Sequence, residues 1–408
     1  MIEPKLRFKA DDGSQFPDWE EKTFNDVADY KKGPFGSALK KEIFVPKSND
    51  TVKVYEQQNA ISKDWKLERY FVTNEYFQSK MKSFAVSGGD IIVSCAGTIG
   101  EMYELPHDAE EGIINQALMR VRIKKSVINS MIFRCVFDKM ISTEGVKISN
   151  GSALKNIPPF ADMKKQSVFV PSLPEQQKIA EFLSTIDTVI AKQKETVSAW
   201  EERKKGMMQK LFSQEVRFKA DDGSDFPDWD EKKLGEVFTE RTERSKGGES
   251  LLSVTIAQGI VKQSETDKRN IASENKSNYK IVKKNDLAYN TMRMWQGAEG
   301  VSEYDGIVSP AYTVITALGG NNSYFFETMF KQTFMLQVFQ RYSQGLTSDT
   351  WNLKFPAFSE IKCQIPCEDE QNKIVECVAV LDEVIEKQKA TLAAWEELKK
   401  GLLQQMFV

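Results

Sequence analysis

The chain repeats one stretch of sequence almost unchanged, and this repeat limits the folds that it can adopt. Residues 7–22 read RFKADDGSQFPDWEEK and residues 217–232 read RFKADDGSDFPDWDEK. A second repeat begins at Pro171 and again at Pro366, and both copies run through KQK and AWEE to a phenylalanine. Repeated segments that flank two unlike stretches of sequence, the inserts, predict two similar modules. Each module is expected to perform a different version of one task.

The second repeat has the periodicity of a long amphipathic helix. From Ile179 and from Ile374, apolar residues recur at steps of three and four with no internal proline. Each helix is expected to span about 35–40 residues, or roughly 55–60 Å. Ser172 and Glu175 have the spacing of a capping box.

An apolar stripe of this length needs a partner, and the other copy of the repeat is the obvious one. We therefore predict an antiparallel helix pair with pseudo-twofold symmetry; the alternative is two separate helices, each packed on its own domain. Gln193 and Gln388 interrupt the stripes at matching places, where they either fix the register or are solvated. The residues expected to pack in the helix pair are Ile179, Leu183, Ile186, Ile190, Trp200, Ile374, Leu381, Ile385 and Trp395.

The two inserts share a skeleton below the level of sequence identity. Asp90-Ile91-Ile92 matches Asp286-Leu287-Ala288, the glycines of GTIG (97 and 100) match those of GAEG (297 and 300), and residues 112–117 match 306–311. Short β-like runs, such as 90–95 and 307–315, alternate with Gly-rich turns. We interpret each insert as the same α+β domain carrying different surface loops.

Polar and basic loop clusters are the candidate contact surfaces, because Arg and Lys suit guanine edges and Asn and Gln suit adenine edges. Clusters of this kind are more often plain solvated surface, and tryptophans such as Trp295 and Trp351 are more often core anchors than base contacts. The candidates in the first insert are Lys31, Lys32, Ser37, Lys40, Lys41, Gln57, Gln58, Asn59, Thr98, Asn115, Gln116, Ser152 and Lys155. The candidates in the second insert are Arg241, Arg244, Lys246, Gln258, Asn290, Thr291, Arg293, Trp295, Gln296, Ser309, Tyr312, Thr347, Ser348 and Trp351.

Charge and composition are compatible with a soluble nucleic-acid binder without establishing one. The net charge is −3, but residues 27–165 hold 21 Lys and Arg against 16 Asp and Glu, an excess of five. No apolar run is long enough for a membrane span. Five unpaired-looking cysteines favour a reducing cytoplasm, and a single histidine argues against a metal site.

Catalytic motifs are missing from the sequence. Asn156-Ile157-Pro158-Pro159-Phe160 resembles the Asn-Pro-Pro-Phe motif of adenine methyltransferases, but an extra Ile separates the Asn from the prolines and no Gly-rich cofactor loop lies upstream. A phosphate-binding loop of the GxxxxGK[ST] type is also absent, and His107 has no equivalent in the second copy. We predict no catalytic residues in this chain.

The layout resembles the specificity subunit of a type I DNA restriction–modification enzyme. The residues that carry the resemblance most specifically are the two helix starts, 171–180 (PSLPEQQKIA) and 366–375 (PCEDEQNKIV). The resemblance implies two target-recognition domains held apart by an antiparallel helix pair, each reading one half of a bipartite double-stranded DNA site. It also implies two methyltransferase subunits and two motor-nuclease subunits as partners, with S-adenosylmethionine, ATP and Mg on those partners and no cofactor here.

The resulting domain scheme has six parts. The parts are an N-terminal linker (1–22), a first recognition domain (23–165), a first helix region (166–213), a linker (214–232), a second recognition domain (233–362) and a second helix region (363–408).

Two competing functions remain beside DNA recognition. One alternative is a two-module coiled-coil scaffold that binds proteins without reading DNA. The other, a single-chain methyltransferase or nuclease, is disfavoured by the missing motifs.

Overall fold

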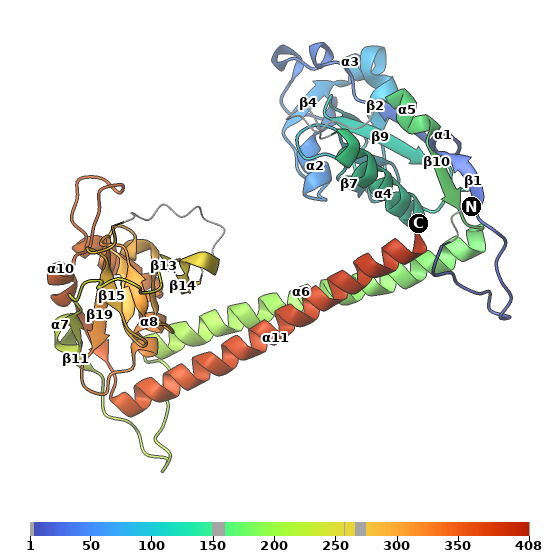
Figure 1. Ribbon diagram of the computed structural model, residues 1–408. Helices are drawn as coiled ribbons and strands as arrows, with labels where there is room; N and C mark the ends of the chain where they lie inside the picture. The colour runs from blue at the N-terminus through green and yellow to red at the C-terminus, as the bar shows by residue number, and fades with distance from the viewer. Residues whose placement is uncertain (1–3, 149–159, 257, 266–274, 408) are drawn as a thin grey trace. The chain divides into compact units, whose positions relative to one another are not determined.

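A computed structural model describes residues 4–148, 160–256, 258–265 and 275–407 of the chain (Figure 1). These residues form two compact units, one of residues 1–192 with 392–408 and one of residues 193–391. Each unit holds one insert and part of each long helix. The boundary between the units therefore falls inside the helices, whereas the predicted domain boundaries lie at the helix ends.

The first unit contains a mixed domain whose largest sheets each have four strands, ordered β2-β9-β6-β7 and β4-β3-β8-β5. The first of these sheets is entirely antiparallel, and β3 with β8 is a parallel pair in the second. Its elements are β1 (Glu20–Thr23), α1 (Phe24–Val27), β2 (Ala28–Lys32), β3 (Thr51–Tyr55), α2 (Gln57–Ile61), β4 (Tyr70–Thr73), α3 (Asn74–Tyr76), β5 (Ala85–Val86), β6 (Ile91–Ser94), β7 (Met102–Glu104), β8 (Gly112–Ile114), β9 (Leu118–Ile123), α4 (Ser130–Ile148), α5 (Phe160–Lys165) and β10 (Ser167–Val170).

The second unit repeats the antiparallel four-stranded sheet, in the order β12-β19-β16-β17. The two-stranded pairing of β1 with β10 is likewise repeated by β11 with β20. Its elements are β11 (Asp230–Lys233), α7 (Leu234–Val237), β12 (Phe238–Glu240), β13 (Leu252–Thr255), β14 (Gly259–Lys262), β15 (Lys280–Val282), β16 (Leu287–Asn290), β17 (Glu299–Val301), β18 (Gly306–Val308), β19 (Tyr312–Ala317), α8 (Ser323–Phe330), α9 (Thr333–Tyr342), α10 (Phe355–Ser359) and β20 (Lys362–Ile365).

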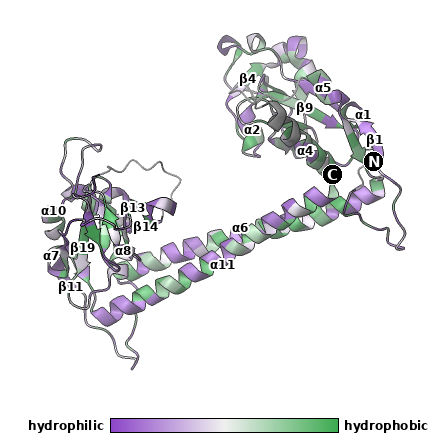
Figure 2. Cartoon of the chain, in the orientation of Figure 1, coloured by the Kyte–Doolittle hydropathy of each residue, from purple (hydrophilic) through white to green (hydrophobic). Residues whose placement is uncertain are grey.

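The two long helices have the lengths that the repeats predicted. Helix α6 (Leu173–Phe212) has 40 residues and α11 (Glu368–Met406) has 39. Green apolar and purple polar positions alternate along both in Figure 2. In the second unit, Gln193 contacts Gln388 and Lys204 pairs with Asp382; in the first, Lys399 pairs with Asp187. In the second unit the partner's residue number falls from 388 to 382 as α6 advances from 193 to 204, so the helices run antiparallel there.

Two local predictions were wrong. Ser172 and Glu175 do not form a capping box: the Ser172 hydroxyl has no hydrogen-bond partner, and the Glu175 carboxylate binds Arg7 and Trp19 instead. The β-like run 307–315 is two strands, β18 and β19, because the segment 309–311 forms a turn between them. The Ser309-Pro310 pair was a turn signal that the prediction of one continuous run overlooked, since proline has no amide hydrogen to donate within a sheet.

Candidate nucleic-acid interface

One turn has the same backbone structure in both domains. Between β8 and β9, the Asn115 side chain accepts a hydrogen bond from the Ala117 amide (3.0 Å), and the Asn115 carbonyl accepts one from Leu118 (3.2 Å). Between β18 and β19, Ser309 makes the equivalent bonds to Ala311 (3.4 Å) and Tyr312 (3.0 Å). Asn and Ser both favour such turns through their side-chain oxygens.

A second turn joins the first at the same end of each four-stranded sheet. The amide of Cys95, just after β6, donates to the carbonyl of Ala117 at 2.8 Å. In the second domain, the Thr291 amide and hydroxyl donate to the carbonyl of Ala311 at 3.3 and 3.0 Å. We name the residues 95–101 with 115–117, and 291–298 with 309–311, the turn end of each domain.

The structure corrects the alignment of the glycines in the second turn. Gly100 (φ 86°) and Gly297 (φ 79°) are equivalent, since each adopts a left-handed conformation just before the strand that follows. Gly300 instead lies within β17 and pairs with Ala288. The equivalent pair in the first domain is Tyr103 with Ile92. The sequence alignment was therefore shifted by three residues.

Several predicted residues of the first domain gather at its turn end. The Gln57 amide nitrogen donates to the Thr98 carbonyl at 3.2 Å. Strand β2, which carries Lys31 and Lys32, ends beside the Asn115 turn, because the next residue, Gly33, donates to the Leu118 carbonyl at 2.8 Å. A Cβ atom on Gly33 would lie 1.8 Å from the Asn115 carbonyl oxygen, so only glycine fits this approach.

Other predicted residues of the first domain lie elsewhere or are engaged. Asn59 is buried, and its side-chain nitrogen donates to the carbonyls of Asp64 and Leu67 at 3.0 and 2.9 Å. It is a structural residue, and a surface position for it was a wrong expectation. Gln58, Ser37, Lys40 and Lys41 are exposed on the connections before and after β3, while Ser152 and Lys155 lie outside the described residues.

The turn end of the second domain is built around two tryptophans. The Trp295 and Trp351 rings meet edge to face with centroids 5.2 Å apart, and both are half-buried. The amide of Leu353 donates to the Thr291 carbonyl at 2.8 Å, which brings the loop holding Thr347, Ser348 and Trp351 against the turn. The remaining predicted residues at this turn end are Asn290, Arg293, Gln296, Ser309 and Tyr312.

Arg241 is engaged in the structure of its domain. Its guanidinium donates to both carboxylate oxygens of buried Asp286, at 2.6 and 3.1 Å, and this hydrogen-bonded pair raises the pKa of Arg241. In the first domain, Arg122 binds the equivalent Asp90 at 2.6 and 2.7 Å, although it comes from β9. Asp90 and Asp286 were recognised as matching positions but not as the carboxylates of an arginine pair. Arg122 was missed, because the two copies supply the arginine from different segments of the chain.

The other basic and polar candidates of the second domain are exposed and lie off the turn end. Arg244 donates to the Asn278 carbonyl at 2.8 Å, and Lys246 is exposed in the following turn. Gln258 is exposed in the connection between β13 and β14, where its amide donates to the Thr255 hydroxyl at 3.0 Å.

The repeated linker clamps the repeated helix start in each unit. Arg7 donates to both carboxylate oxygens of Glu175 (3.1 and 2.8 Å), and the Trp19 indole donates to the same carboxylate at 3.2 Å. Arg217 and Trp229 bind Glu370 in the same way, at 3.1, 2.7 and 3.0 Å. Both glutamates are buried. This clamp explains why the two repeats keep the same residues, and no local pattern in the sequence predicts it.

The residues predicted to pack in the helix pair occupy its buried side to different degrees. Ile179, Leu183, Ile186, Ile190, Ile374 and Ile385 are buried, whereas Trp200, Leu381 and Trp395 are half-buried. The side-chain nitrogen of Gln193 donates to the Gln388 side-chain oxygen at 2.7 Å and to its carbonyl at 3.0 Å. Ile179 and Leu183 also join the core of the first domain, and Ile374 that of the second.

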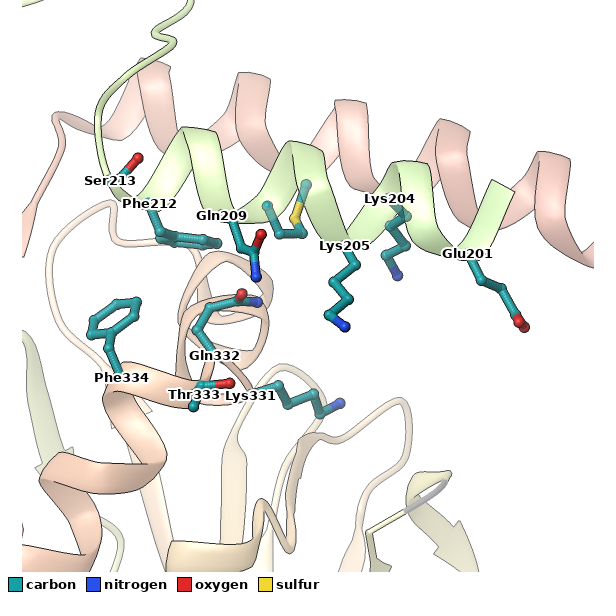
Figure 3. A pocket seen from close by; sticks show the side chains of 11 residues that line it. Glu201, Lys204, Lys205, Gln209, Phe212, Ser213, Lys331, Gln332, Thr333 and Phe334 are labelled. Atoms are coloured by element: carbon teal, nitrogen blue, oxygen red, sulfur yellow. The ribbon is translucent and has the colours of Figure 1, made fainter. Parts of the chain in front are cut away.

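A cavity of about 710 Å³ lies beside α6 in the second unit (Figure 3). Its lining includes Lys204, Lys205 and Lys331 beside the rings of Phe212 and Phe334. Two of these cations are already engaged, Lys204 with Asp382 and Lys331 with Glu327. The cavity is therefore only weakly suited to an anion.

The described residues offer little else for chemistry. They contain no group of three or more His, Cys, Asp or Glu placed to hold a metal ion, and no helix long and apolar enough to cross a membrane. Burial raises the pKa of the thiols of Cys95 and Cys363 to about 12 and that of Cys135 to about 11. These three thiols are thus neutral and poor nucleophiles at neutral pH.

The model of the type I restriction modification DNA specificity domain matches residues 17–198 and again residues 227–394. The chain belongs to this family. Two matches to one model confirm that the inserts are copies of one α+β domain, with the long helix α6 leading from the first toward the second. The predicted type I restriction–modification specificity subunit is confirmed at this level, and with it the DNA target-recognition domains.

Individual relatives agree with the family. The type I restriction enzyme MjaVIII specificity subunit of Methanocaldococcus jannaschii is 24% identical over 251 residues, 56% of this chain and 52% of that relative. The chain thus matches about half the length of this curated relative. The crystal structure of the type I restriction–modification S subunit from M. genitalium has a TM-score of 0.52 at 17% identity, covering 100% of this chain and 99% of that one.

A further solved chain comes from work on complex assembly and conformational transition of the type I restriction–modification system. It has a TM-score of 0.59 at 13% identity and covers 96% of this chain and 98% of its own length. At such identities the likeness concerns the fold alone. Specificity subunits of this family are generally non-catalytic, which agrees with the missing catalytic motifs.

Proposed function

We propose that this chain is the sequence-specific DNA-binding subunit of a type I restriction–modification complex, with each domain reading one half of a bipartite site. The observation that supports this proposal most directly is the structure of the two turn ends. Both domains hold the same pair of turns by the same hydrogen bonds to the backbone, but the side chains on these turns differ. A fixed scaffold with variable side chains is what two readers of different half-sites require.

The contacts divide into two kinds. Asn115, Gln116 and Thr98 in the first domain, and Asn290, Arg293 and Gln296 in the second, offer donors and acceptors to base edges. Exposed Lys32, Lys40 and Lys41 supply phosphate contacts that set position rather than sequence. Asn59 and Arg241 are left out of this interface, because both side chains are held within their domains.

The helix pair keeps the two readers at a set spacing and offers two equivalent surfaces to two identical methyltransferase subunits. The clamp of Arg and Trp on a buried Glu is the same in both units, which supports two equivalent docking frames. Two motor-nuclease subunits would join this assembly in the cytoplasm. S-adenosylmethionine, ATP and Mg would be held by those partners, which carry out adenine-N6 methylation and ATP-dependent cleavage.

Methylome sequencing of cells that carry the chain with its neighbouring methyltransferase tests this function directly. We expect a bipartite methylated motif with a fixed spacer. Exchange of residues 233–362 for those of a related chain should change one half of the motif and leave the other half and the spacer unaltered. A change in both halves would refute the assignment of one domain to one half-site.

The second candidate function is a protein-binding scaffold that does not read DNA, favoured by the net charge of −3. The two functions differ in their response to salt. A DNA-reading subunit should bind the bipartite duplex with an affinity that falls steeply as salt rises, because counterions are released from the phosphates. Binding to a partner protein that is indifferent to the duplex would favour the scaffold.

A further inference from the structure

The two most exposed large apolar side chains in the described part of the chain are Phe35 and Leu346, at 90% and 100% exposure. One belongs to each domain. A single exposed apolar residue is ordinary on a protein surface, so the position and support of these two residues decide whether they have a role.

Phe35 stands on a loop that is fixed on both sides. Gly33 before it is hydrogen-bonded to Leu118 beside the first turn end, and Pro34 is buried. After it, the Ala38 amide donates to the Phe35 carbonyl at 2.8 Å, and the Tyr76 hydroxyl donates to the Ala38 carbonyl at 2.7 Å. The Phe35 ring is therefore presented to solvent by an ordered backbone next to the turn end.

Leu346 stands on a loop of comparable order. Gln344 and Asn352 exchange two backbone hydrogen bonds of 2.8 Å across its base. Within it, the Thr350 amide donates to the Thr347 carbonyl at 2.9 Å. Trp351 then packs on Trp295, which attaches the loop to the second turn end. The loop leaves the domain between α9 and α10 as the orange projection in Figure 1.

Cations lie near both positions along the chain, although the charged residue nearest to Leu346 in sequence is Asp349. Lys31, Lys32, Lys40 and Lys41 lie within six residues of Phe35 along the chain. Near Leu346, Arg341 and Lys354 are exposed to either side, and Arg293 is exposed on the adjoining turn. A lone apolar tip among cations fits duplex DNA, where phosphates flank an apolar base stack, better than a protein partner, which requires a broad patch of roughly 800 Å².

We propose that Phe35 and Leu346 are apolar wedges, each entering the base stack of one half-site; this rests on the proposed DNA-reading function. Phe and Leu are among the side chains that proteins insert between base steps, and an ordered loop avoids the entropy cost of fixing the wedge on binding. A loosened stack also lowers the energy needed to flip a neighbouring base, which a partner methyltransferase requires.

The test uses the full chain assembled with its methyltransferase on a duplex carrying the methylated motif. 2-Aminopurine, whose fluorescence rises when it unstacks, is placed at successive steps of each half-site in separate duplexes. We expect a rise at one step or more of each half-site with the unaltered chain. Phe35→Ala should abolish the rise in one half-site and Leu346→Ala in the other, each lowering affinity about ten- to a hundredfold.

The two variants serve as controls for each other, and Leu318→Ala is a further matched control. Leu318 is 40% exposed and follows β19 at the opposite end of the sheet from the second turn end. It should alter neither fluorescence nor affinity. Phe35→Leu should retain most of the affinity, because it keeps an apolar tip. Since both wedge residues are exposed, thermal unfolding of the variants should match that of the unaltered chain.

The possible outcomes distinguish a failure of the wedge proposal from a failure of the proposed DNA-reading function. Specific binding of the duplex with no fluorescence rise at any step overturns the wedges and leaves the DNA-reading function standing. Loss of methyltransferase assembly in Phe35→Ala or Leu346→Ala, at unchanged DNA affinity, also overturns them and assigns the residues to a protein contact. Failure of the unaltered complex to bind the duplex would overturn the proposed function itself.

Discussion

The first and second domains share their backbone scaffold and its junction with the helices, and they differ in the side chains and helices attached to that scaffold. Both have the same four-stranded sheet, the same pair of turns and the same linker clamp on a buried glutamate. They differ in the turn side chains and in the packing helix, which is continuous in the first domain (α4) and divided into α8 and α9 in the second. The constant contacts are those that join each domain to the helices, so the domains can diverge without disturbing that junction.

The largest expected effect comes from shortening the helices unequally. Deleting residues 193–196 from α6 alone removes Gln193 and displaces Lys204 from Asp382, so we expect loss of duplex binding. Deleting 193–196 together with 388–391 removes equivalent segments of the two repeats, QKET and QKAT. Because both helices are shortened by the same length, the pairs Lys204–Asp382 and Lys399–Asp187 can still form. About 6 Å is then lost from each helix. We expect binding to return with a spacer shorter by no more than about two base pairs, as measured on duplexes of graded spacer length. An unaltered spacer would refute the helix pair as its determinant.

The clamps should be equally important in the two units. Glu175→Ala removes the buried carboxylate that binds the guanidinium of Arg7, which is only 19% exposed, and leaves it the exposed Asp18 at 3.8 Å. Glu370→Ala does the same to Arg217, which is 22% exposed and keeps the exposed Asp228 at 3.4 Å. Removal of one partner of such a pair costs about 3–5 kcal/mol. Denaturant unfolding should show the first variant destabilising the first unit and the second variant the second unit. Exposed Glu181→Ala and Glu376→Ala are matched controls on the same helices, and equal losses in these controls would contradict the clamp.

The sequence predicted the repeated parts of the fold better than the variable parts, and for a physical reason. Helix periodicity is a local property, so α6 and α11 could be read directly from the spacing of Ile179 and its successors. The clamp of Arg7 on Glu175 joins residues 168 positions apart, which no local pattern reveals. Among the predicted contact residues, Asn59 and Arg241 have the residue types of base contacts, but burial and a carboxylate neighbour hold them within the domains. Exposure depends on tertiary packing and is invisible in residue type.

A buried carboxyl distinguishes the second domain from the first. Glu299 on β17 is fully buried and neither carboxyl oxygen has a hydrogen-bond partner, although the Lys331 ammonium lies 3.8 Å from one of them. Met102 occupies the equivalent place on β7. Burial raises the pKa of Glu299 well above 4.5. Because the folded pKa is raised, the stability from this group is full below about pH 4.5 and is lost as pH rises toward the folded pKa.

Glu299→Met should therefore stabilise the second unit by about 1–3 kcal/mol at neutral pH, the cost of an unsatisfied buried polar group. Lys331 keeps its 2.6 Å pair with Glu327 in this variant. The gain over the unaltered chain should shrink as pH falls toward 4.5, which urea unfolding at several pH values measures. A gain that did not change with pH would exclude titration of Glu299 as its cause.

The smallest expected effect concerns the glutamines that are equivalent in the two repeats. Gln193→Leu leaves the Gln388 side chain without its 2.7 Å partner, and the net loss of one such hydrogen bond is about 1 kcal/mol. Gln193→Leu with Gln388→Leu replaces both partners by apolar groups, so a double-mutant cycle should show the double variant to be more stable than the sum of the single changes predicts. A polar pair in an otherwise apolar helix seam specifies register at a cost in stability. The double variant should therefore gain stability while tolerating a second spacer length in the methylome. Retention of a single spacer would show that Lys204–Asp382 and Lys399–Asp187 suffice to hold the register.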